Sequence, residues 1–75
     1  EGRLLDFSFN TIHNPNQAAA TRVYAMSIVH RMVKKHPELA TELAQSIEIA
    51  CEHGTPGMKN RGGKILKDLM KKGLL

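Results

Sequence analysis

The residues NPNQAAATRVYAMSIVHRMVKKHP, positions 14–37, decide the fold class of this 75-residue chain. Asn14 suits the N-cap of a helix, and Pro15 suits its first position, where a missing N–H costs nothing. Positive side chains near the other end complement the exposed carbonyls of a last turn. We therefore predict a helix over residues 14–36, closed by Pro37. One broad arc of it is apolar, made of Ala18, Ala19, Ala25, Met26, Ile28, Val29, Met32 and Val33. That arc is too wide for one partner, so we expect neighbours on two sides.

The leading segment also shows helical spacing. Leu5, Phe9 and Ile12 follow an i, i+4, i+7 pattern, which predicts a short helix over residues 3–12. Partial alternation over residues 7–12 leaves a strand as the alternative.

A second amphipathic segment follows Pro37. Its apolar arc consists of Leu39, Ala40, Leu43, Ala44, Ile47, Ala50 and Cys51. Its opposite side carries Glu38, Glu42, Gln45, Glu48 and Glu52 and reads as a solvated face. Gly54 fits the C′ position of this helix, and Thr55 with Pro56 fits the start of another. The inner face predicted for that last helix is Gly62, Ile65, Leu66, Leu69 and Met70. Residues 73–75 are expected to form a frayed end or a clipped continuation.

Length and composition limit the chain to a single domain, residues 1–75. Phe7, Phe9 and Tyr24 are its only aromatic residues, so the core must be aliphatic, which favours helices over a sheet sandwich. The single Cys51 excludes an intramolecular disulfide and indicates a reducing, cytoplasmic location. No apolar run approaches the roughly 20 residues that span a bilayer, so no membrane partner is predicted. Because the first residue is Glu, we expect the C-terminal piece of a longer protein.

Two segments of the chain open alike after a proline-containing break. Arg22 is followed 39 residues later by Arg61, and Met26 is followed at the same interval by Ile65. The segments that carry this pattern are residues 20–26, 36–39 and 54–61. The pattern resembles a HEAT repeat, whose units of about 40 residues each contain two packed helices. The clearest departure is the Gly62-Gly63 pair, which stands where Val23-Tyr24 follows Arg22.

The resemblance implies an all-α fold of HEAT-like antiparallel helical hairpins, a fragment of an armadillo-type α–α superhelix. Residues 4–12 would end one unit, residues 14–51 would form a full unit, and residues 55–72 would begin the next. Relatives of this helical type sometimes carry an adenylosuccinate lyase label. The signature loop of those lyases, Gly-Ser-Ser-x-Met-Pro-x-Lys-x-Asn, is matched here only by residues 57–60, which lack the serine pair. A structural part of such a lyase is therefore kept only as an alternative.

Arg22 projects from the middle of the apolar arc of its helix. A buried guanidinium needs a carboxylate or backbone carbonyls, because an unpaired buried charge is costly. We predict a structural ion pair between Arg22 and Asp6, one helix earlier, and the resemblance places this arginine between repeats.

The last helix carries a row of positive side chains opposite Leu66 and Met70. The row consists of Arg61, Lys64, Lys67, Lys71 and Lys72, with Asp68 as its lone acid and Lys34 and Lys35 as candidate extensions. Such a row binds a phosphate backbone in some HEAT-like proteins, whereas a solvated helix face is the plainer interpretation. No aromatic residue is interleaved for stacking on bases, which argues against single strands. The candidate binding residues are Arg61, Lys64, Lys67 and Lys71.

No pattern predicts catalysis, a cofactor or a metal site. His13, His30, His36 and His53 share no i, i+3 or i, i+4 spacing, whereas a structural zinc site normally needs four convergent ligands. Cys51 lies on an apolar arc and is expected to behave as a small buried hydrophobe.

These patterns predict a non-catalytic scaffold or protein-interaction module, with a protein partner or a second copy of the chain as its ligand. Nucleic-acid binding through the basic last helix is the alternative. The shared core is expected to contain Val29, Val33, Leu39, Leu43, Ile47, Ile65 and Leu69. Repeat fragments leave their terminal faces bare, so we also expect self-association. The faces concerned carry Leu4, Leu5, Phe7 and Phe9 at one end and Leu66, Met70, Leu74 and Leu75 at the other.

Overall fold

The computed structural model describes residues 2–75 and contains four α-helices, with no strand among those residues. The helices are α1 (Gly2–His13), α2 (Ala19–Met32), α3 (Leu39–Glu52) and α4 (Pro56–Lys71). The prediction of an all-α fold is confirmed, and the helical interpretation of the leading segment is correct.

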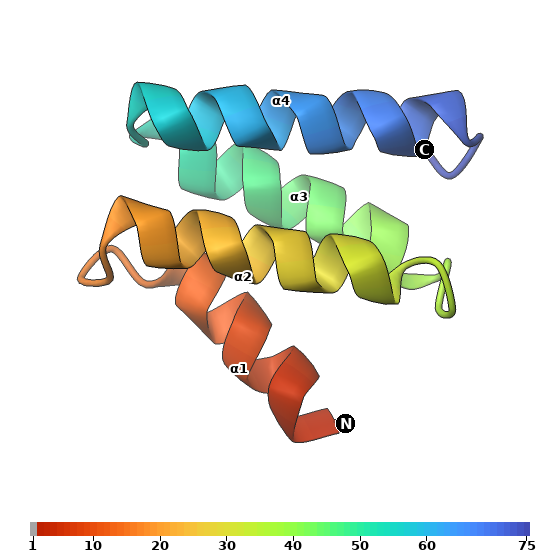
Figure 1. Ribbon diagram of the computed structural model, residues 1–75, viewed down its shortest axis with the longest axis horizontal. Coiled ribbons are helices and arrows are strands. Elements are labelled where there is room, and N and C mark those ends of the chain that lie inside the picture. Colours follow the sequence, from red (N-terminus) through yellow and green to blue (C-terminus); the bar gives the residue numbers. More distant parts are fainter. Residues whose placement is uncertain (1) are drawn as a thin grey trace.

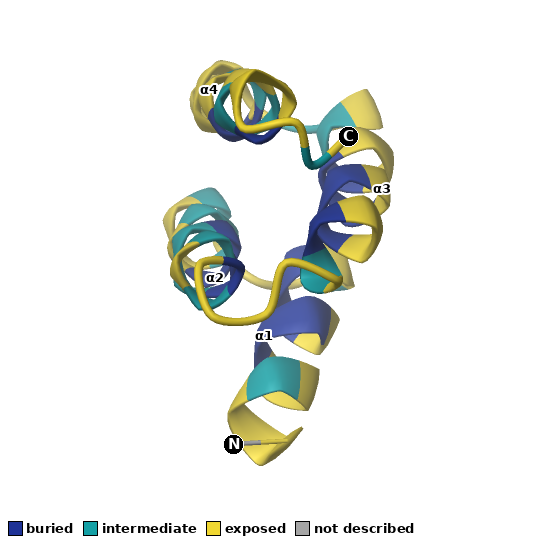
Figure 2. Cartoon of the chain, turned by 90° about the vertical axis from the view of Figure 1, so that its right-hand side faces the viewer, coloured by how far each residue is buried: buried dark blue, intermediate teal, exposed yellow. Residues whose placement is uncertain are grey.

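The four helices form two layers (Figures 1 and 2). Helices α2 and α4 lie side by side in one layer, and α1 and α3 lie in the other. Each helix contacts the next along the chain, so the backbone crosses between layers at every turn. Helix α1 makes no contact with α4. This is the predicted arrangement of antiparallel hairpins, with α2 and α3 as a full unit between one half unit and another.

One apolar core joins all four helices. Its members are Phe9, Ile12, Ala25, Met26, Val29, Val33, Ala40, Leu43, Ile47, Ala50, Met58, Ile65 and Leu69. Six of the seven predicted core residues are in this cluster, and Leu39 is half-buried against it. Helix α2 is enclosed on three sides, because it packs against α1, α3 and α4.

Helix α2 begins later than the sequence predicted. Asn14 is not its N-cap: the Asn14 side-chain oxygen accepts a hydrogen bond from the backbone N–H of Asn16, at 2.9 Å. This turn, formed by an Asn side chain with its own backbone, competes with a helical start. The helix starts at Ala19 after an extended Ala18 that makes no side-chain cap bond. The predicted roles of Asn14 and Pro15 are therefore wrong.

The turn between α3 and α4 is partly as predicted. The Thr55 hydroxyl accepts a hydrogen bond from the N–H of Met58, at 3.2 Å, and Pro56 occupies the first position of α4. Gly54 does not adopt the left-handed conformation expected of a C′ glycine. A Cβ on Gly54 would lie 3.1 Å from the Ala50 carbonyl oxygen and from Met58 Cε, so this glycine permits a close approach.

The C-terminal end is capped, not frayed as predicted. Gly73 has a φ of 72° and donates its N–H to the Met70 carbonyl. Leu74 donates its N–H to the Leu69 carbonyl, at 3.0 Å, and packs against the core. These two bonds make a Schellman motif, in which a left-handed glycine follows the helix and a hydrophobic residue comes next.

Candidate functional site

Arg22 does not pair with Asp6. Its Nε–H donates to the backbone carbonyl of Ile12, at 2.8 Å, and the ion pairs among residues 2–75 do not include Asp6, which is exposed. Ile12 lies in the last turn of α1, where carbonyls lack partners within the helix and the helix dipole is negative. The half-buried guanidinium of Arg22 thus closes the C-terminal end of α1. Arg22 therefore bonds to a backbone carbonyl, which the sequence analysis gave as the alternative to a carboxylate.

Three of the four predicted binding residues lie together. Lys64, Lys67 and Lys71 line one shallow groove along α4 and are exposed. Arg61 is exposed as well, but it lies nearer the start of α4 and does not line that groove. The fourth lining residue is Asp68, the only acid of this helix.

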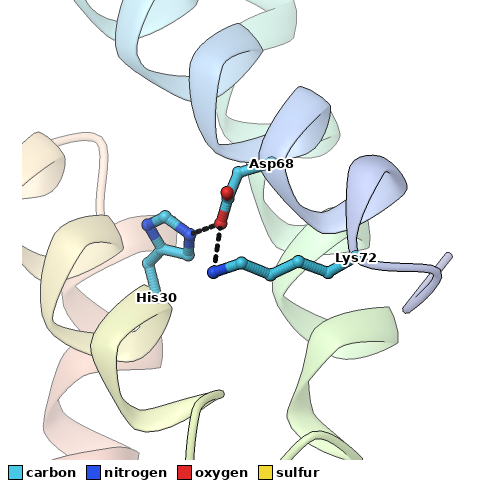
Figure 3. Close-up of polar contacts among 3 residues, drawn as sticks. All are labelled: His30, Asp68 and Lys72. Carbon is cyan, nitrogen blue, oxygen red and sulfur yellow. Dashed lines mark hydrogen bonds and ion pairs between the residues drawn. The ribbon is translucent and has the colours of Figure 1, made fainter.

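The carboxylate of Asp68 is bonded to two side chains, those of His30 and Lys72 (Figure 3). Its Oδ2 accepts from His30 Nε2 of α2 at 2.7 Å and lies 3.0 Å from Lys72 Nζ. These contacts, the hydrogen bond from His30 first and that from Lys72 second, hold the pKa of Asp68 below its ordinary value. Asp68 is therefore ionised at neutral pH, and it links α2 to α4. The sequence analysis left His30 outside the apolar arc of its helix and missed this contact, although the i, i+4 spacing of Asp68 and Lys72 was visible.

Charge is divided between the two layers. Of the eleven lysines and arginines, all but Arg3 lie in α2, in α4 or in the turns that directly follow these helices. Asp68 is the one acid within α2 and α4, and Glu38 lies in the turn between α2 and α3. Helix α3, in the other layer, carries Glu42, Glu48 and Glu52 and no lysine or arginine. The α2–α4 layer is therefore basic and α3 is acidic.

A family model for the HEAT repeat domain matches residues 2–69 of the chain. The chain belongs to the HEAT repeat family. The match extends from the start of α1 almost to the end of α4, so it covers both layers. No curated protein and no solved structure matches the sequence significantly. Among the described residues, no helix of this HEAT repeat domain is long and apolar enough to cross a membrane.

The remaining reactive side chains of the HEAT repeat are dispersed. His13 Nε2 lies 3.0 Å from the Ser46 hydroxyl, and no three histidine, cysteine or acidic side chains of residues 2–75 converge as metal ligands would. Cys51 Sγ donates to the Met58 carbonyl at 3.4 Å. Burial raises the pKa of the Cys51 thiol, with Arg22 and Lys59 opposing the shift. Cys51 is thus a half-buried thiol in a packed interface, without the lowered pKa of a nucleophilic cysteine.

Proposed function

We propose that this HEAT repeat is a non-catalytic scaffold that binds helical protein surfaces through its two apolar edges, either in further repeat units or in a second copy of the chain. One observation carries the proposal. Phe7 on α1 and Met70 on α4 are 63% and 65% exposed, and they lie on helices at opposite ends of the stack. Apolar side chains of this size usually mark contact sites when they form part of a larger patch.

The leading edge is formed by α1. Leu4 is 49% exposed, and with Met32 of α2 and Lys35 of the following turn it lines a groove that borders this edge. Phe7 lies one turn along the same helix. A helix laid against α1 would remove both side chains from water, which contributes about 25 cal/mol for each Å² of apolar surface.

The trailing edge is formed by α3 and α4. A shallow groove of about 320 Å³ lies between them, with an apolar floor and a charged border. Its lining residues are Ile47, Glu48, Cys51, Glu52, Lys59, Gly63 and Leu66. An apolar centre within a polar rim is typical of protein interfaces. Gly63, which has no atom near its missing side chain, keeps this surface flat enough for a helix to approach.

Analytical ultracentrifugation of the whole chain at tens of micromolar tests the proposal. We expect self-association that is weakened by Phe7→Glu or Met70→Glu. Ile49→Glu is the matched control, because Ile49 is 61% exposed but lies among the glutamates of α3. A monomer at these concentrations, unchanged by salt, would contradict docking of a second copy. An equal effect of Ile49→Glu would show that the edges have no special role.

The lyase alternative receives no support from the local structure. Residues 57–60, the nearest match to the lyase loop, form the first turn of α4, so they do not provide a flexible loop over a substrate. An assay of the whole chain with adenylosuccinate would decide this alternative. A cytoplasmic location is likewise proposed, on the single free cysteine, Cys51.

A further inference from the structure

We infer that the C-terminal halves of α2 and α4, together with the turn that follows α2, form a binding surface for the phosphate backbone of a duplex nucleic acid. This surface, here called the basic face, consists of Arg31, Lys34, Lys35, Lys64, Lys67 and Lys71. It contains three residues of the row predicted on the last helix and the predicted extensions Lys34 and Lys35, and it adds Arg31; Arg31 and Lys35 also line the groove at the leading edge.

The fold brings these six residues onto the C-terminal halves of two neighbouring helices and the turn after α2. Helices α2 and α4 share a layer and run in the same direction, so their C-terminal ends lie close together (Figure 1). Lys34 lines the groove between the two helices, and Asp68 lines both that groove and the one that contains Lys64 and Lys67. Arg31 and Lys35 continue the surface on the side of α2 that faces α1. All six side chains are exposed.

Two acids lie near this surface, Asp68 of α4 and Glu38 in the turn after α2, and each has a partner. His30 and Lys72 both bond Oδ2 of Asp68, as Figure 3 shows, and the Lys72 ammonium offsets the charge of this carboxylate. None of the six residues of the basic face makes an ion pair with an acid among residues 2–75. Their charges therefore remain available to a ligand.

Stabilisation by the helix dipole explains only some of the positive side chains of the basic face. Cations in the last turn of a helix complement its free carbonyls, and Arg31 and Lys71 lie in such turns. Lys64 and Lys67 precede the last turn of α4, where the dipole effect has fallen away. Packing does not explain them either, because both are exposed.

The shape of the basic face favours a duplex. From Lys64 to Lys71 is seven residues, or about 10 Å along a helix, which matches about three phosphates at 3.4 Å per charge on one strand. Among residues 2–75, no Phe, Tyr or Trp lines the grooves that contain these residues, whereas single strands are bound by stacking on aromatic side chains. Because the acidic helix α3 lies in the other layer, a polyanion can approach the α2–α4 side of the molecule.

The experiment measures binding of the whole chain to a fluorescent duplex by anisotropy as salt is raised. Duplexes of mixed sequence and about 20 base pairs, one of DNA and one of RNA, are used between 50 and 200 mM salt. Six phosphate contacts predict a log–log salt slope of about −5 on DNA, and an affinity loss of about 10³-fold over that range. Binding to only one duplex would identify which nucleic acid supplies the phosphates.

The decisive comparison uses two variants that each lose two charges. Lys64→Gln with Lys67→Gln removes two contacts and should reduce the DNA slope by about 1.8. Arg3→Gln with Lys59→Gln is the control, because Arg3 lies on α1 and Lys59 borders the trailing groove. Its slope should stay near the wild-type value, and circular dichroism should show both variants folded.

Three results would overturn the inference. One is an equal reduction of the salt slope in the two double variants, which would show that only the net charge of the chain matters. Another is no duplex binding in 50 mM salt at about 100 μM protein, near the weak limit of nonspecific binding. The last is binding to vesicles that contain anionic lipid, lost in Lys64→Gln with Lys67→Gln, without binding to either duplex.

Discussion

Gly62 of α4 lies directly against Ile47 of α3: a Cβ built on Gly62 would be 2.7 Å from Ile47 Cγ2 and 3.0 Å from Cys51 Sγ. This contact sets the spacing between the two helices. Ile47 is buried, and a β-branched side chain in a helix has essentially one rotamer, so it has little freedom to move away. The Gly62→Ala change should lower the free energy of unfolding by about 1 kcal/mol, because an overpacking cost of about 2 exceeds a gain in helix propensity of about 1.

The neighbouring glycine provides the matched comparison. Nothing lies within 4 Å of a Cβ on Gly63, so Gly63→Ala should raise the free energy of unfolding by about 1 kcal/mol through helix propensity alone. Denaturant unfolding of the two variants should therefore give shifts of opposite sign. Equal stabilisation by both would contradict the close approach at Gly62.

Arg22 is expected to stabilise the fold through the carbonyl of Ile12. Removing the side chain leaves a carbonyl at the end of α1 without its charged donor, and hydrogen bonds to charged groups are worth about 1.5–3 kcal/mol. Arg22→Ala should thus lower the free energy of unfolding by about 2 kcal/mol. Asp6→Ala should change it by less than about 0.5 kcal/mol, as for an ordinary surface substitution. A large effect of Asp6→Ala would contradict the carbonyl contact and support the ion pair between Arg22 and Asp6.

The fold was predictable because its helices are amphipathic. The 3.6-residue spacing of apolar residues identified each helix and most of the core, and the interval from Met26 to Ile65 identified the repeat. The start of α2 was not predictable in the same way. Asn14 has two local options, a helix cap and a turn with its own backbone, and the structure shows the turn.

The candidate site was predictable only where it is local to one helix. Lys64, Lys67 and Lys71 share a face by spacing, and the structure places them together. His30 and Asp68 are 38 residues apart, and their contact depends on how α2 lies beside α4. The width of the basic face depends on the same packing. It requires α2 and α4 to share a layer and a direction, which no single-helix pattern contains.

Gly73 should contribute to stability through its left-handed backbone. Its φ of 72° costs an L-residue about 1–2 kcal/mol, and the bonds of the Schellman motif depend on this conformation. We expect Gly73→Ala to lower the free energy of unfolding by about 1 kcal/mol. Gly57→Ala is the control, because Gly57 lies in a helix and has only Thr55 Oγ1, at 3.9 Å, near its missing Cβ. Gly73→Ala without loss of stability would mean that residues 73–75 fray in solution.

Asp68 should make stability depend on pH in the acid range. Its pKa in the folded chain is lowered by His30 and Lys72, so between the folded value and the ordinary value of about 3.9 the unfolded chain binds more protons. The contribution of Asp68 is therefore complete above the ordinary value and is lost as pH falls through the lowered one. The amide in Asp68→Asn keeps the shape and removes the charge. The wild-type chain should be the more stable one near about pH 6, and the difference should vanish as Asp68 becomes protonated at low pH.

Denaturant unfolding of the two chains at a series of pH values measures that difference. The matched control is Glu42→Gln, because Glu42 is exposed on α3 and makes no ion pair within residues 2–75. The free energy of unfolding of Glu42→Gln should fall at acid pH in the same way as that of the wild-type chain. Added salt should shrink the gap between Asp68→Asn and wild type, since Asp68 is partly exposed and its attraction to Lys72 is screened. A constant gap from neutral to strongly acid pH would show that Asp68 acts by shape alone, and that its charge does not bind α2 to α4.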